Sequence, residues 1–220
     1  MSKEKYISNA KEVLKEHEYT LLAKGDDCEI WKCSKSNTNV YAFNIAVTPM
    51  GISVVGDIGD YTFGVYGRNV SFLAGRDVEY YIHSKLSPNC KEVEFDMDNF
   101  REAVVNEIKD HTEVDYEEIY EKIKDLYFDE IKDCLWQFWK NSLVTDEIYD
   151  FLNNITDVLK EADLIEDANG AYTFLENCKT LNFADSWEYE LEKPSEKLIR
   201  TLYIINEAAK QIVEKVESEN

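Results

Sequence analysis

The segment ISVVGDIGDYTFGVYG, residues 52–67, decides the fold class of the N-terminal half of the chain. Alternating apolar residues flank a Gly-Asp-Ile-Gly sequence, a pattern that is typical of two strands joined by a tight turn. Glycines in such a turn supply positive φ angles, and aspartates hydrogen-bond to nearby backbone groups. The segment therefore predicts a strand–turn–strand element.

Similar alternation on the N-terminal side extends this element into a sheet. Residues 20–34 predict a hairpin that turns at Lys24–Asp26, and residues 40–48 predict a further strand. Residues 71–75 are expected to form a short strand or turn. The apolar residues of segment 2–18 recur at helical spacing, so a helix is expected before the strands. Together these patterns predict an antiparallel meander of about five strands.

The rest of the chain shows mainly the 3.6-residue period of amphipathic helices. The predicted helices span residues 76–86, 99–111, 115–140 and 145–163, and a last one begins near Pro194. The fold class is therefore α+β. We expect an antiparallel-sheet domain with its helices at residues 1–95 and an acidic, mostly helical domain at residues 96–220.

An Asn-Gly pair at residues 169–170 is a strong turn signal, and it predicts a small hairpin near residues 164–175. A helix followed by such a hairpin has the order of a winged helix. A DNA-binding wing carries Lys or Arg at its tip, whereas this one would carry Glu166 and Asp167. If the winged shape forms, we expect it to contact protein.

The charge of the chain is distributed unevenly. Its formal net charge is -21, of which residues 1–90 contribute -1 and residues 91–220 contribute -20. So acidic a region repels phosphates, which argues against nucleic acid or an anionic membrane as its direct ligand. It is compatible with a partner protein that has a basic surface.

A row of carboxylates in the predicted helix 115–140 is the leading candidate for a partner-binding site. Five acidic residues recur at every fourth position: Glu117, Glu121, Asp125, Asp129 and Asp133. On a helix they would be spaced by roughly 6 Å, similar to the phosphates of one nucleic-acid strand. The alternative is an ordinary solvated face, since nearby lysines can pair with these carboxylates.

The Gly-Asp turn offers a second candidate, a ligand-binding turn formed by Gly56, Asp57, Gly59 and Asp60. It lacks the Lys and Ser/Thr of a P-loop, and no helix follows it, so a purely structural turn is favoured. In a metal-dependent nuclease, Asp57 and Asp60 would have to converge with Asp77 and Glu79 to hold the metal ion. The sequence contains no compact motif for such a site. We therefore predict no catalytic residue, metal site or cofactor.

Two further features of the sequence bear on assembly and location. The last helix carries an apolar heptad seam over residues 198–216, which suits either a homodimer or, as we favour, packing within its own domain. No apolar run approaches the roughly 20 residues of a membrane span, and the N-terminus lacks a signal-peptide core. A cytoplasmic protein is expected.

Residues 40–105 resemble a group of uncharacterised proteins encoded by tailed phages and prophages. The similar elements are the apolar strand FNIAVT, the turn from Gly56 to Gly59, the aromatic strand YTFGV and the helix DVEYYIHSKL. No functional residues follow from this resemblance. It implies a phage accessory gene, and small acidic phage proteins often act in counter-defence or host takeover.

These observations lead to one functional prediction and two alternatives. We expect a non-enzymatic protein of the host-cell cytoplasm that binds and inhibits a host protein through its acidic surface. The most plausible target is a nucleic-acid-handling anti-phage defence enzyme with a basic surface. The alternatives are a sponge that sequesters a nucleotide signal and a metal-dependent nuclease; a structural role in the phage particle also remains open.

Overall fold

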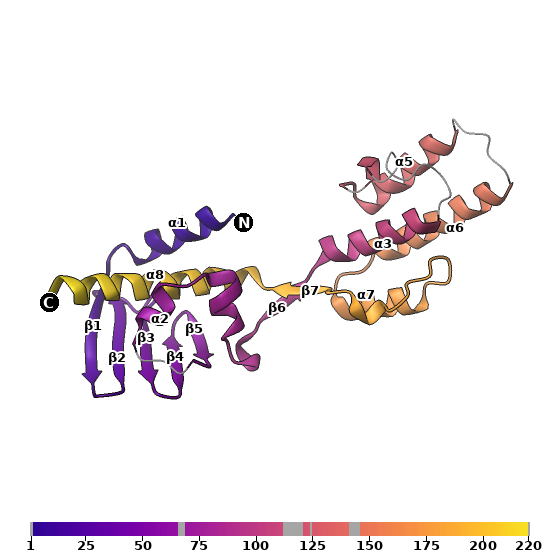
Figure 1. The fold of residues 1–220 in the computed structure, drawn as a ribbon. Helices are drawn as coiled ribbons and strands as arrows, with labels where there is room; N and C mark the ends of the chain where they lie inside the picture. The colour runs from indigo at the N-terminus through magenta and orange to yellow at the C-terminus, as the bar shows by residue number, and fades with distance from the viewer. Residues whose placement is uncertain (1, 66–68, 112–120, 124, 141–145, 220) are drawn as a thin grey trace. The chain divides into compact units, whose positions relative to one another are not determined.

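The protein is described by a computed structural model, which covers residues 2–65, 69–111, 121–123, 125–140 and 146–219 (Figure 1). The chain divides into two compact units. The first, here called the sheet unit, combines Met1–Val93 with Pro194–Asn220, and the second, the helical unit, is Glu94–Lys193. The chain passes between them twice, where strand β6 (Val93–Phe95) pairs with strand β7 (Glu192–Pro194).

The sheet unit contains a five-stranded antiparallel meander, which confirms the predicted α+β class. Its strands lie side by side in sequence order: β1 (His17–Lys24), β2 (Glu29–Lys35), β3 (Phe43–Thr48), β4 (Gly51–Gly56) and β5 (Gly59–Phe63). Alternate residues of β3 are buried and the residues between them are not, as expected for a sheet with one covered face.

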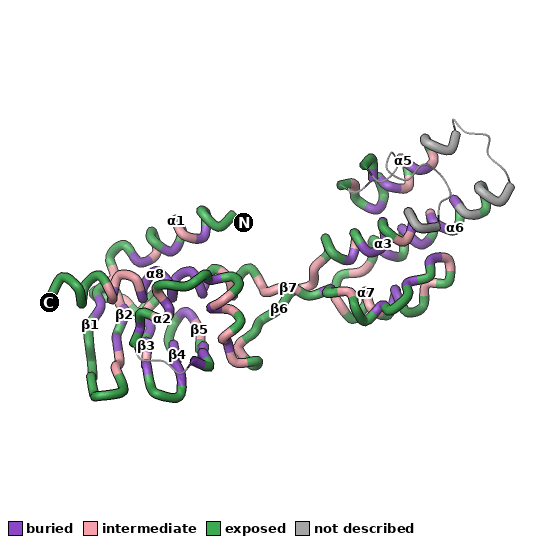
Figure 2. The backbone as a smooth tube through the Cα atoms, in the orientation of Figure 1, coloured by how far each residue is buried: buried purple, intermediate pink, exposed green. Residues whose placement is uncertain are grey.

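Three helices contribute to the core on the covered face of the sheet: α1 (Lys3–Leu14), α2 (Ser71–Ala74) and α8 (Glu196–Glu219). Leu198, Leu202 and Ile205 of α8 are fully buried in the same cluster as Ile45 and Val54 of the sheet. Figure 2 shows the buried residues that line α8 and the strands. The final helix therefore belongs with the N-terminal sheet, which corrects the predicted division into residues 1–95 and 96–220.

Specific side chains also tie α8 to the elements around it. The ring of Tyr203 stacks on that of Tyr6 in α1, with centroids 5.3 Å apart. The buried amide of Asn206 donates to the carbonyl oxygen of Leu73 in α2. Because an unpaired buried amide would be costly, this hydrogen bond fixes how α8 meets α2.

The segment after β5 differs in detail from its prediction. Residues 71–75 begin with the short helix α2 and form no strand. The predicted helix 76–86 contains a single five-residue π-helical turn, η1 (Val78–Ile82), whose first turn is capped by Asp77. A 3₁₀ turn, η2 (Pro88–Cys90), follows this segment.

The helical unit is formed by α3 (Met97–His111), α5 (Phe128–Lys140), α6 (Asp146–Asp163), α7 (Ala168–Asn177) and the 3₁₀ turn η3 (Ser186–Glu188). It has a hydrophobic core of its own. Phe100 of α3 is fully buried there, and its ring meets the rings of Phe128 and Phe174 edge-on at 5.9 and 5.6 Å. This aromatic cluster joins α3, α5 and α7 within the unit.

The single helix predicted over residues 115–140 is wrong in its described part. The chain leaves the helix at residues 125–127 and α5 begins at Phe128. The side chain of Glu130 reaches back and accepts a hydrogen bond from the Tyr127 backbone N–H at 3.0 Å, as in a capping box. The sequence therefore contains a helix start that its apolar period does not show.

The hairpin predicted near residues 164–175 is also wrong, because residues 168–177 form α7. Asp167 caps this helix by accepting a hydrogen bond from the Gly170 N–H at 2.8 Å. The Asn-Gly pair lies in the first helical turn, where the cost of glycine is small. No wing therefore follows α6, and the winged-helix order is absent from this segment.

The turn between β4 and β5 has a glycine that the packing requires. Gly56 pairs with Gly59 across the hairpin. A Cβ atom at Gly56 would lie 2.4 Å from the Ala42 carbonyl oxygen and 2.5 Å from the Phe43 Cα, both backbone atoms that cannot give way. Glycine at this position therefore permits the close approach of β3 to the end of β4.

We predict that Gly56→Ala destabilises the sheet unit by about 1–3 kcal/mol, the usual cost of overpacking a rigid site. Gly64→Ala is the matched control, because its Cβ would meet only the Lys85 carbonyl oxygen at 3.9 Å, an ordinary contact. Urea unfolding followed by circular dichroism compares the two. Equal midpoints for both variants would contradict the proposed clash.

Candidate functional site

The two units differ sharply in charge. Residues 94–193 carry 28 acidic and 9 basic residues, a net of -19 in 100 residues, whereas the remaining 120 residues carry a net of -2. Residues 194–220 contribute only -1 of the net charge of -20 on residues 91–220. The acidic character of the chain is therefore a property of the helical unit.

Basic residues neutralise only part of this charge. Lys160 pairs with Asp157 at 2.8 Å, and Lys193 pairs with Asp96 at 3.1 Å and Asp98 at 4.0 Å. The hydrogen bond to Asp96 raises the pKa of Lys193, so this lysine keeps its charge. Even if all nine basic residues of the unit were paired, most of its carboxylates would lack a basic partner.

The predicted carboxylate row is only partly assembled by the fold. Glu121, Asp125, Asp129 and Asp133 are all exposed, and Glu117 lies outside the described residues. Asp129 and Asp133 are one turn apart on α5. Glu121 lies before the break in the helix and Asp125 lies within it, so the four do not form one evenly spaced row. They form an exposed acidic segment around the start of α5.

The Gly-Asp turn is occupied by structural hydrogen bonds. The Asp57 carboxylate accepts from the Tyr41 backbone N–H at 2.7 Å, and the Asp57 N–H donates to the Ala42 carbonyl oxygen at 2.8 Å. These bonds hold the loop before β3, in which Tyr41 adopts a positive φ of 56°. Asp60 lies exposed on β5. The turn thus supports the structural alternative, with the Asp57 N–H unavailable to a phosphate.

The carboxylates proposed for a nuclease have other partners in this fold. Asp77 accepts a hydrogen bond from the Tyr80 N–H and forms an ion pair with Lys3 at 3.1 Å. Glu79 accepts a hydrogen bond from the Tyr203 hydroxyl at 2.7 Å. Within the described ranges, no group of three or more His, Cys, Asp or Glu side chains is placed to hold a metal ion.

The cysteines lie in different environments. Cys33 is fully buried in the sheet unit, and burial raises the pKa of its thiol to about 12, whereas Cys28 is exposed. Since a thiol reacts as its thiolate, Cys33 is unreactive at neutral pH. All five cysteines are free thiols in the structure.

The heptad seam of α8 is largely covered within the chain. Leu198, Leu202, Ile205, Ala209 and Ile212 are buried in the sheet unit, and only Val216 at the end of the seam is exposed. The seam therefore packs within the chain, but against the sheet unit and not within the predicted domain 96–220.

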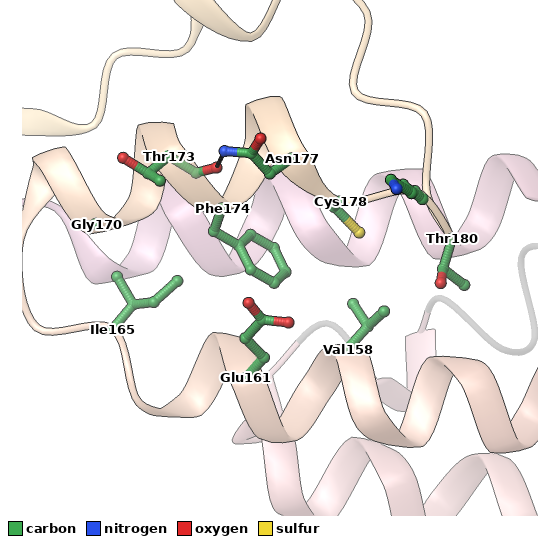
Figure 3. Close-up of a pocket in the computed structure, with 10 residues that line it drawn as sticks. Val158, Glu161, Ile165, Gly170, Thr173, Phe174, Asn177, Cys178 and Thr180 are labelled. Atoms are coloured by element: carbon green, nitrogen blue, oxygen red, sulfur yellow. Dashed lines mark hydrogen bonds between the residues drawn. The ribbon is translucent and has the colours of Figure 1, made fainter.

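A cavity of about 620 Å³ lies between α6 and α7 in the helical unit (Figure 3). Val158, Ile165 and Phe174 supply apolar walls, and Glu161, Asn177 and Lys179 supply polar groups. Its volume lies within the roughly 300–1,000 Å³ of small-ligand sites. Sequence analysis missed this cavity, because α7 was predicted as a hairpin and no local pattern indicates how two helices pack.

No family model, curated protein or solved structure matches this chain. None of the helices in the described ranges is long and apolar enough to cross a membrane. What the protein does must therefore be inferred from its own residues.

We predict that Asp57→Ala lowers the free energy of unfolding by about 1 kcal/mol, the usual net value of one hydrogen bond. Asp60→Ala removes the same charge from the next strand and is expected to change stability by less than about 0.5 kcal/mol. Thermal unfolding of the two variants at neutral pH measures the difference. A ligand-binding role without a structural one would leave both variants as stable as the parent chain.

Proposed function

We propose that this chain is a phage or prophage accessory protein that binds and inhibits a host protein through its helical unit. The target we propose is a nucleic-acid-handling defence enzyme with a basic surface. The observation that carries the proposal is the net charge of -19 on a single compact unit of 100 residues. Binding, with no chemical step, is the activity that this surface supports best.

Charge of one sign concentrated on one unit has a physical consequence for association. Within the roughly 8 Å screening length of physiological salt, its field attracts a basic surface before contact. Such attraction raises the association rate and orients the encounter. A basic nucleic-acid groove is the surface most complementary to it, since the groove is built to receive regularly spaced negative charges.

The exposed acidic segment around α5 is the part of the unit that we propose to make first contact. Glu121, Asp125, Asp129 and Asp133 are exposed there within thirteen consecutive residues. Because the segment changes direction at residues 125–127, its carboxylates follow a bent path. The proposed contact therefore depends on negative charge that faces a basic groove. It does not require carboxylates at the spacing of phosphates.

The proposal predicts that a fourfold variant (Glu121→Gln, Asp125→Asn, Asp129→Asn, Asp133→Asn) binds its partner about tenfold or more weakly at physiological salt. Exposed charge pairs contribute roughly 0.2–1 kcal/mol each, so four pairs near the middle of this range account for a tenfold loss, about 1.4 kcal/mol. The partner is first captured from a host extract on the intact chain and identified by mass spectrometry. Its affinity is then measured against salt concentration with purified components.

A matched control changes the same number of charges on the sheet unit: Glu18→Gln, Asp26→Asn, Asp27→Asn and Asp60→Asn, all exposed positions. This control should bind as the parent chain does, and duplex DNA or RNA should compete with the parent chain for the partner. Equal affinities and equal salt slopes for the two fourfold variants would contradict the electrostatic mechanism. A captured protein that does not bind nucleic acid would contradict the proposed target class.

A further inference from the structure

We propose that the cavity between α6 and α7 receives an arginine side chain from the basic surface of the partner. This inference rests on the proposed function and assigns one anchoring contact within it. In this cavity of the helical unit a cationic side chain would meet both an apolar wall and a carboxylate. An arginine has both parts, a hydrocarbon stem and a planar charged end.

The apolar walls of the cavity are held in place by the core of the unit. Val158 and Phe174 are 7% and 6% exposed, so only a small part of each faces the cavity. The ring of Phe174 contacts the rings of Phe100 at 5.6 Å and Phe183 at 6.1 Å. A wall fixed in this way needs little ordering when a side chain binds, which reduces the entropic cost of binding.

The carboxylate of Glu161 gives the cavity its preference for a cation. Figure 3 shows this carboxylate pointing from α6 into the space below the Phe174 ring. A guanidinium group placed there would meet the carboxylate on one side and the aromatic ring on another, the two partners it prefers. Among the described residues, Glu161 forms no ion pair within 4 Å that would neutralise it beforehand.

The other polar groups of the lining offer an anion few charged partners. One N–H of the Asn177 amide donates to the Thr173 carbonyl oxygen at 2.8 Å within α7, which leaves its second N–H for a ligand. Lys179 is the one cationic side chain among the lining residues. Its positive charge is outweighed by the net charge of -19 on the helical unit, and the field of that charge favours a positively charged occupant.

The test uses the whole 220-residue chain and a small probe, N-acetyl-L-arginine amide, with alkylation of Cys178 by iodoacetamide as the readout. Cys178 lines the cavity and is half-buried, whereas Cys28 is exposed in the sheet unit and serves as the internal control. N-acetyl-citrulline amide is the neutral isostere, and ionic strength is held constant. A ligand of this size is expected to bind with a Kd of about 1 mM.

We expect the arginine probe to slow alkylation of Cys178 severalfold and saturably, without slowing that of Cys28. The citrulline probe should have no such effect. Glu161→Gln should abolish the protection, whereas Glu176→Gln, which removes the same charge from an exposed position of α7 outside the lining, should retain it. Failure to protect Cys178, equal protection by citrulline, or full protection in Glu161→Gln would each overturn the inference.

The outcomes also separate this inference from the proposed function. If the probe fails while the fourfold acidic variant still loses the partner, the cavity is excluded and the acidic surface stands. If the probe protects Cys178 while partner binding is insensitive to the acidic residues, the cavity binds arginine and the proposed function is wrong.

Discussion

The burial of one face of α8 against the five-stranded sheet is the interaction on which the rest of the structure depends. Leu198, Leu202, Ile205 and Ile212 are fully buried there, each contributing roughly 1.5–3 kcal/mol of transfer free energy. Because this helix is at the C-terminal end of the chain, its return to the sheet makes residues 94–193 an insertion. The order of the units along the chain is thus sheet, helical insertion and closing helix.

This arrangement explains how the chain accommodates a charge of -21. The sheet unit has a net of -2 and a core assembled from both ends of the chain. The insertion has its own core around Phe100. It therefore folds without burying its carboxylates against the sheet. Self-repulsion among 28 carboxylates is therefore confined to the helical unit. A basic partner would relieve this repulsion on binding, which links the charge distribution to the proposed function.

Local sequence patterns correctly predicted the elements that are determined by residue spacing and turn residues. The meander from β1 to β5 followed from period-two alternation and its turn residues, and Gly56 was correctly placed at a tight turn. Two predictions failed where a capping side chain outweighed the pattern: Asp167 starts α7 at an Asn-Gly pair, and Glu130 starts α5 within a helical period. The partner of α8 and the cavity beside Glu161 depend on long-range packing, which no local spacing indicates.

Native-state hydrogen exchange measured across a urea series tests the central structural claim, that α8 forms one cooperative unit with the N-terminal sheet. The account predicts that amides of residues 198–212 lose protection together with those of residues 43–63. Amides of residues 100–108 and 152–175 should lose theirs in a separate step. If residues 198–212 instead open together with residues 152–175 while residues 43–63 stay protected, the last helix belongs to the helical unit. That result would contradict a cooperative unit of α8 and the sheet.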